Sequence, residues 1–133
     1  MTTLLLVAAA ALIDRDGRVL LAQRPPGKSM EGLWEFPGGK LKTGEAPEAA
    51  LIRELKEELG VHTDTACLAP IAFASCEVED GHLLMPLFVC RKWSGTPRPL
   101  EGQSLKWVRP NQFLNYEMVP ADKPLAAQLR DFL

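Results

Sequence analysis

The chain has 133 residues, a formal net charge of −2 at pH 7, 47% hydrophobic residues and 24% charged residues. This length and balance predict a single soluble domain over residues 1–133 with one hydrophobic core. The small net charge argues against a nucleic-acid polymer as partner, because such partners usually require a basic surface.

The first predicted element is the uninterrupted apolar segment at residues 4–13. Its periodicity does not distinguish a strand from a buried helix, and its alanine and leucine content favours a helix. Ten residues without a preceding Lys or Arg predict neither a membrane span nor a signal peptide. A tight turn at residues 14–17 then leads into a strand predicted at residues 19–23.

Prolines and glycines organise the next segment. Residues 25–31 are rich in Pro, Gly and Ser and predict a loop, and residues 34–36 predict a short extended segment before Pro37. Gly38 and Gly39 then allow a backbone path that is closed to other residues.

A helix is predicted to begin near Pro47, a residue tolerated in a first turn, and to end before Gly60. Apolar residues recur in it at intervals of three and four, so one face is expected to pack on a sheet. This predicted apolar face consists of Ala49, Ile52, Leu55 and Leu59.

Three acids of this helix, Glu54, Glu57 and Glu58, share another face. They occupy its last two turns, where the helix dipole disfavours anions, so a positive partner is expected. Oxygen ligands without a Cys or His suit Mg2+, with Mn2+ as a possible substitute. The alternative is a solvated face with an ion pair between Arg53 and Glu57. That alternative does not explain the upstream glycine pair or Glu45.

Beyond the helix, strands are predicted at residues 68–78 and 82–92, joined by a turn. Residues 93–103 predict a loop, residues 104–108 a strand, and residues 121–132 a closing helix.

The cysteines and histidines are not expected to take part in chemistry. Cys67, Cys76 and Cys90 lack paired short spacing, which predicts free thiols in a reducing cytosol and therefore a cytoplasmic protein. His62 and His82 lie without a ligand pattern and are predicted to be non-catalytic.

One segment carries a demanding pattern: Gly39, five residues, Glu45, seven residues, and then Arg-Glu-Leu-Lys-Glu-Glu-Leu-Gly-Val at residues 53–61. It matches every defined position of the Nudix box, so the chain resembles the Nudix hydrolases. Nearly the whole chain, from about residue 4, resembles the MutT branch of that family. The segments that carry this second likeness are Gln23-Arg24, residues 34–40, residues 101–103, Trp107-Val108 and residues 120–125.

The resemblance implies an α/β class, specifically the Nudix fold, an α/β/α sandwich in which the box helix packs on a mixed, curved sheet. It assigns residues 4–13 to a strand. It also implies Mg2+-dependent hydrolysis of a nucleoside triphosphate to the monophosphate and pyrophosphate, in which the protein mainly positions charge.

The same resemblance implies roles for individual residues. Glu54, Glu57 and Glu58 would ligate metal together with the carbonyl of Gly39, and Glu54 or Glu57 would take the proton from water. Arg53 would orient these carboxylates.

A distal acid completes the implied site. Glu101 would be a further metal ligand or base, and the alternative is a surface loop acid.

Substrate-binding roles are less specific. Arg24 and Lys40 are expected to bind a phosphate or the sugar, although both would be unremarkable as exposed cations. Gly38 is expected beside the substrate. Phe36 would stack on the base, although an aromatic between two strands is more often part of the core.

Asp122 is the candidate for base selection. In MutT proteins that prefer 8-oxoguanine nucleotides the matching residue is an asparagine, and a related group acting on cytidine nucleotides carries Pro-Ala-Asp. An ionised carboxylate only accepts hydrogen bonds, so it favours the exocyclic amine of cytosine or adenine unless burial keeps it protonated. The alternative is a cap on the last helix.

The leading hypothesis is therefore a MutT-type enzyme that removes oxidised nucleotides such as 8-oxo-dGTP from the pool, in support of DNA replication and repair. Alternatives are hydrolysis of (d)CTP or 5-methyl-dCTP, hydrolysis of ADP-ribose or dinucleoside polyphosphates, and a non-catalytic nucleotide sensor. A small nucleotide is the expected partner, without a membrane, and the protein is expected to be a monomer or a homodimer.

Overall fold

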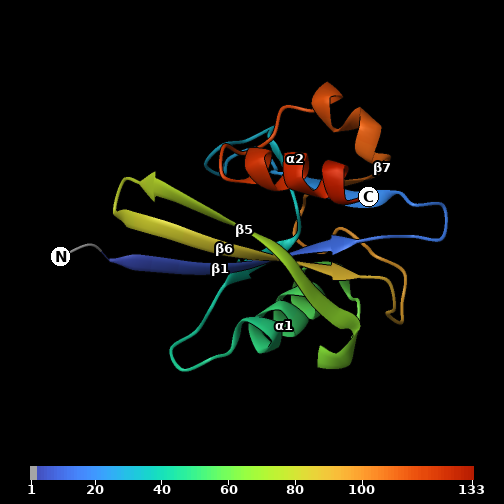
Figure 1. Ribbon diagram of the computed structural model, residues 1–133, viewed down its shortest axis with the longest axis horizontal. Coiled ribbons are helices and arrows are strands. Elements are labelled where there is room, and N and C mark those ends of the chain that lie inside the picture. The colour runs from blue at the N-terminus through green and yellow to red at the C-terminus, as the bar shows by residue number, and fades with distance from the viewer. Residues whose placement is uncertain (1–2) are drawn as a thin grey trace.

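The computed structural model describes residues 3–133 as an α/β fold in which helices cover a central sheet from two sides (Figure 1). One sheet has the strand order β4-β1-β6-β5, and the other has the order β3-β2-β7. The strands are β1 (Leu4–Leu12), β2 (Val19–Gln23), β3 (Trp34–Glu35), β4 (Gly38–Lys40), β5 (Leu68–Val78), β6 (Gly81–Cys90) and β7 (Ser104–Val108). The helices are α1 (Pro47–Leu59), α2 (Asp122–Phe132) and the short 3-10 segments η1 (Thr65–Cys67) and η2 (Pro110–Asn115).

Strand β1 is the centre of the larger sheet. It pairs in parallel with β6 and antiparallel with β4. Its residues alternate between two cores: Ala9 and Ala11 contribute to one, and Ala8, Ala10 and Leu12 contribute to the other. Residues 8–12 are buried on both faces and need no polar alternation, which explains the apolar sequence of this half of the strand and overrides its helical propensity.

Helix α1 packs below β1 through Leu51, Leu55 and Leu59, which are fully buried against the alanines of the strand. The predicted apolar face is rotated in the structure, because Ala49 is exposed and Ala50 is buried. Gly60 ends the helix in the left-handed conformation, as predicted, with φ of 70°.

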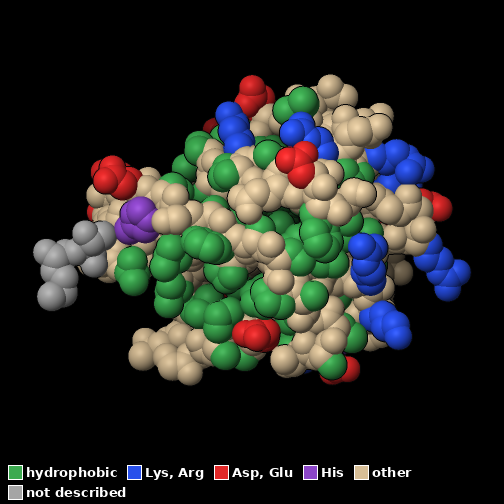
Figure 2. Space-filling view, viewed as in Figure 1, with side chains coloured by type: hydrophobic (Ala, Val, Ile, Leu, Met, Phe, Trp, Pro, Cys, Tyr) green, Lys and Arg blue, Asp and Glu red, His purple; other side chains and the backbone are tan. Residues whose placement is uncertain are grey.

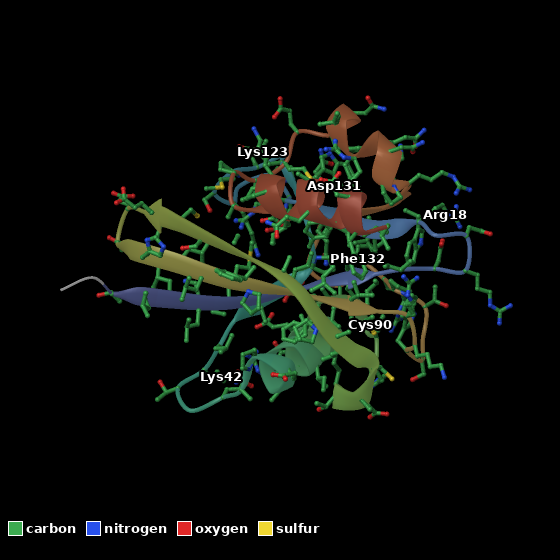
Figure 3. The ribbon with its side chains drawn as sticks, in the orientation of Figure 1. Arg18, Lys42, Cys90, Lys123, Asp131 and Phe132 are labelled. Carbon is green, nitrogen blue, oxygen red and sulfur yellow. The ribbon has the colours of Figure 1, made fainter. Side chains whose placement is uncertain are left out.

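Helix α2 covers the opposite side of the sheet with Leu125, Ala126 and Leu129. The strand predicted at residues 82–92 ends earlier, at Cys90, and the short segment η2 lies between β7 and α2. Cys90 marks the end of β6, and Lys42 lies on the loop from β4 into α1 (Figure 3). Among residues 3–133, no helix is long and apolar enough to span a membrane.

Candidate active site

A cavity of about 270 Å³ lies where β4, the end of α1 and the loop before β7 meet. It brings together most of the predicted site residues, although they come from distant parts of the sequence. Those that line it are Arg24, Phe36, Gly38, Gly39, Lys40, Glu58, Glu101 and Asp122. Arg53, Glu54 and Glu57 do not line it.

The glycine pair forms one wall of the cavity and leaves no room for side chains. Gly38 and Gly39 pair with β1, and a Cβ atom on Gly38 would collide with the carbonyl oxygen of Ala8. A Cβ atom on Gly39 would collide with the carboxyl group of Glu54. The Glu54 carboxylate therefore lies directly against the backbone of β4.

Arg53 organises the carboxylates next to this wall. Its Nε and Nη2 atoms donate to the two oxygens of Glu45 at 3.0 and 2.9 Å, and Nη1 donates to Glu54 at 2.8 Å. Nη2 also donates to the carbonyl of Lys40 at 3.1 Å. Hydrogen bonds from Arg53 and from the Lys42 amide lower the pKa of Glu45 to about 2. Glu57 is farther from this network, with 3.6 Å between Arg53 Nη1 and Glu57 Oε2, and its side chain is 54% exposed.

Glu58 has the most perturbed carboxyl group of the cavity. Burial raises its pKa to about 9, and the neighbouring carboxylates of Glu54, Glu101 and Glu35 contribute in the same direction. Acidic oxygens are thus gathered without enough positive charge to balance them.

These residues fit a divalent cation by chemistry rather than by preformed geometry. Within the described part of the chain, no three His, Cys, Asp or Glu side chains are arranged as a group that could hold a metal ion. The donors around Gly39 are nevertheless carboxylate and carbonyl oxygens, which suit hard cations, and excess negative charge surrounds Glu58. A cation here would have to draw Glu54 and Glu58 into place.

Arg24 and Glu35 form a polar pair on another side of the cavity. Arg24 Nη2 donates to Glu35 Oε1 at 3.1 Å, while Arg24 Nη1 donates to the carbonyl of Ser29 at 3.3 Å. Arg24 Nε is buried and has no hydrogen-bond partner in residues 3–133. Burial raises the pKa of Glu35, and Arg24 opposes that shift. Sequence reasoning gave Glu35 no role, although an acid between two aromatics beside the glycine pair was a usable signal.

Asp122 is 3% exposed and accepts a hydrogen bond from the Phe36 amide at 2.8 Å across 86 residues of sequence. Burial raises its pKa to about 7. The N-cap of α2 is Ala121, and the Asp122 carboxylate bonds to the Phe36 amide instead of to the helix, so the alternative of a helix cap is wrong. The Phe36 ring packs edge-on against Phe113 in the core, with ring centroids 6.2 Å apart.

Known proteins resemble this chain over nearly its whole length. A family model described as NUDIX domain matches residues 3–129. The chain is 40% identical over 116 residues to a CTP pyrophosphohydrolase of Escherichia coli (strain K12), covering 87% of this chain and 84% of that protein. It is 30% identical over 126 residues to an 8-oxo-dGTP diphosphatase of the same organism, covering 93% and 95% respectively.

The fold is shared as well. The solution structure of the E. coli ORF135 protein matches with a TM-score of 0.86 at 36% identity, covering 98% of this chain and 91% of that one. This match confirms the predicted α/β fold.

Proposed function

The chain belongs to the Nudix family as a hydrolase of the MutT type, and we propose that it cleaves nucleoside triphosphates to the monophosphate and pyrophosphate with Mg2+. The observation that carries this proposal is the cavity that Glu58, Glu101 and Gly39 line together, with the carboxyl group of Glu54 lying against Gly39. Such a concentration of carboxylates fits a site that works on phosphate anions through a cation.

Each acid has a place in this proposal. Glu54, Glu57, Glu58 and Glu101 would hold the cation together with the carbonyl of Gly39. When bound, a divalent cation supplies neutralisation of the phosphate charge and lowers the pKa of the attacking water.

The remaining work belongs to side chains of the chain itself. Arg53 fixes the position of Glu54 through the hydrogen bond at 2.8 Å. Either Glu54 or Glu57 would accept the proton of the attacking water, and Glu57 is exposed enough to turn toward the cavity mouth.

Arg24 and Lys40 would bind the charged part of the substrate. The buried Nε atom of Arg24 lacks a partner, and a phosphate or sugar oxygen would satisfy it. Lys40 is exposed at the rim beside Gly39, where a polyphosphate would leave the cavity. Both contacts add to ground-state affinity and to the orientation of the scissile bond.

Asp122 is compatible with two classes of base, and the protonation state of its carboxyl group decides between them. As a carboxylate, held by the Phe36 amide, Asp122 accepts from an exocyclic amine and favours cytosine. As a neutral acid, which its pKa of about 7 permits, Asp122 donates to a carbonyl such as O6 of 8-oxoguanine. The relatives named for CTP and for 8-oxo-dGTP are in line with these two candidates.

A substrate panel tests both candidates. The kcat/KM values for 8-oxo-dGTP, dGTP, dCTP, 5-methyl-dCTP and ADP-ribose should show Mg2+-dependent pyrophosphate release from the triphosphates. Asp122→Asn should lower kcat/KM for dCTP by about 10-fold or more relative to 8-oxo-dGTP. The substitution replaces a hydrogen-bond acceptor that faces the base with a donor. An unchanged ranking would show that Asp122 does not read the base. Tight nucleotide binding without turnover under any metal would favour a sensor instead.

The acids of α1 provide a second test. Glu57→Gln should lower kcat by about 100-fold or more, because it removes a charge from the reaction site. Glu48→Gln, in the first turn of the same helix, is the matched control and should retain activity. Full activity in Glu57→Gln would reject the role assigned to this glutamate.

A further inference from the structure

The loop before β7 is fastened to the last turn of α1 by backbone hydrogen bonds. The Leu100 amide donates to the carbonyl of Glu58 at 3.1 Å, and the Arg98 amide donates to the carbonyl of Leu59 at 3.0 Å. The last carbonyls of a helix have no partner within the helix, so the loop satisfies acceptors that α1 leaves open. The cavity wall that carries Glu101 is thereby built onto the end of α1.

The side chain of Gln103 adds a link between two acids of the site. Its Nε2 atom donates to the carbonyl of Glu58 at 3.2 Å, and its Oε1 atom accepts from the amide of Glu101 at 2.8 Å. A flipped amide would set donor against donor and acceptor against acceptor, so the two contacts define one orientation. Gly102, with φ of 78°, provides the tight turn that lets residue 103 reach back to residue 101.

Glu101 is held in place through its backbone. It is exposed, and its carboxylate makes no hydrogen bond or ion pair with any residue in the range 3–133. Gln103 is half-buried and lines the same cavity as Glu58 and Glu101. The amide of Gln103 is thus the side-chain group that ties the backbone of Glu101 to the backbone of Glu58.

We propose that Gln103 is a positioning residue that sets the separation of the Glu101 and Glu58 carboxylates across the cavity. This role rests on the proposed function, in which both carboxylates serve the same reaction. Gln103 acts through the backbone of Glu101 and needs no contact of its own with the substrate.

The first test uses the metal-free protein and requires no activity. In Gln103→Met, which keeps the length of the side chain but removes both hydrogen bonds, hydrogen exchange at the Glu101 amide should accelerate by about 10-fold or more. Amides of β1 should keep their protection, because the core is unaffected. Unchanged exchange at Glu101, or loss of protection throughout the protein, would overturn the proposal.

The second test is a kinetic cycle with the best triphosphate substrate. Gln103→Met should lower kcat by about 10- to 100-fold and leave KM within about twofold, because it misplaces a reacting group rather than a binding group. In a Glu101→Gln background the same substitution should cause no further loss, since its effect passes through Glu101. Gln112→Met, at an exposed site in η2, is the matched control.

Equal losses in both backgrounds would overturn the proposal, and so would an unchanged kcat in Gln103→Met. Absence of turnover in the wild-type protein would instead reject the proposed function. In that case the exchange experiment still decides whether Gln103 holds Glu101.

Discussion

At the scale of single residues, the site departs from the rule that charged groups stay at the surface. Asp122 is almost fully buried, yet its carboxyl group accepts a single hydrogen bond, from the Phe36 amide. Glu58 sits among other carboxylates, and its pKa is raised to about 9. Because burial disfavours the charged forms of both acids, we expect them to lower the free energy of unfolding at neutral pH.

Asp122 should make stability depend on pH. Because burial raises its pKa from 3.8 to about 7, the folded state holds this proton more tightly than the unfolded state. Its contribution is fully present below about pH 4 and is lost as pH rises toward 7. The free energy of unfolding of Asp122→Asn should therefore exceed that of the wild type by a growing margin over this range, reaching a few kcal/mol. Urea unfolding at a series of pH values measures the difference, and parallel curves would contradict it.

At the scale of elements, α1 is held in place by its apolar face and also by hydrogen bonds between charged groups that join it to the preceding loop. Glu45 accepts from Arg53 and from the Lys42 amide, so the loop from β4 and the second turn of the helix share one charged network. The guanidinium is well suited to this because it donates in several fixed directions at once.

Arg53→Lys should break that network although it keeps the charge. A lysine cannot bond both oxygens of Glu45 and also Glu54, so we expect a loss of about 1–3 kcal/mol in the free energy of unfolding. The loss of kcat should be larger than this stability change explains, because Glu54 is released from its position. Arg18→Lys, in a more exposed pair with Asp14, is the control and should change stability by less than about 1 kcal/mol. Equal effects of the two substitutions would argue against a special role for Arg53.

Most elements were predictable from the sequence, because turns, prolines and strong apolar patterns mark their ends. Two features were not. The segment at residues 4–12 has the composition of a helix, and it is a strand because it pairs with β4 and β6 and because residues 8–12 are covered on both faces. The orientation of α1 was predicted with Ala49 inside, because alanine spacing alone does not fix the rotation of a helix about its axis.

Site residues that belong to one continuous sequence motif were predictable. Pairs of residues that the fold brings together from different parts of the chain were not. The box supplied Gly39 and its glutamates, whereas the pair of Arg24 with Glu35 arises from strands that meet only in space. The hydrogen bond between Phe36 and Asp122 spans most of the chain and leaves no local pattern.

At the scale of the whole molecule, the small net charge hides the fact that basic and acidic side chains are unevenly distributed over the surface. Figure 2 shows Lys and Arg side chains gathered toward the side on which the turn from β1 to β2 lies in Figure 1. Arg91 lines two adjoining concavities there, one with Arg15 and Lys92 and the other with Arg109. A separate cavity is lined by the acids Glu35, Glu58, Glu101 and Asp122, so the total of −2 describes neither region.

The core between β1 and α1 should be intolerant of added volume. Ala10 is fully buried beneath α1, so Ala10→Val should lower the free energy of unfolding by about 1–3 kcal/mol through overpacking. Ala127→Val, on the exposed side of α2, is the control and should change it by less than about 0.5 kcal/mol. Chemical denaturation measures both, and a neutral effect at Ala10 would mean that α1 shifts to accommodate the methyl groups.

The parallel pairing of β1 with β6 has a consequence for how the protein folds. Leu4 lies beside His82 and Leu12 beside Cys90, so the two strands pair across a long intervening segment of the chain. Closing so long a loop is entropically costly, and non-local pairings of this kind slow folding. We expect this pairing to form late in folding, after the pairing of β1 with β4, which closes a shorter loop.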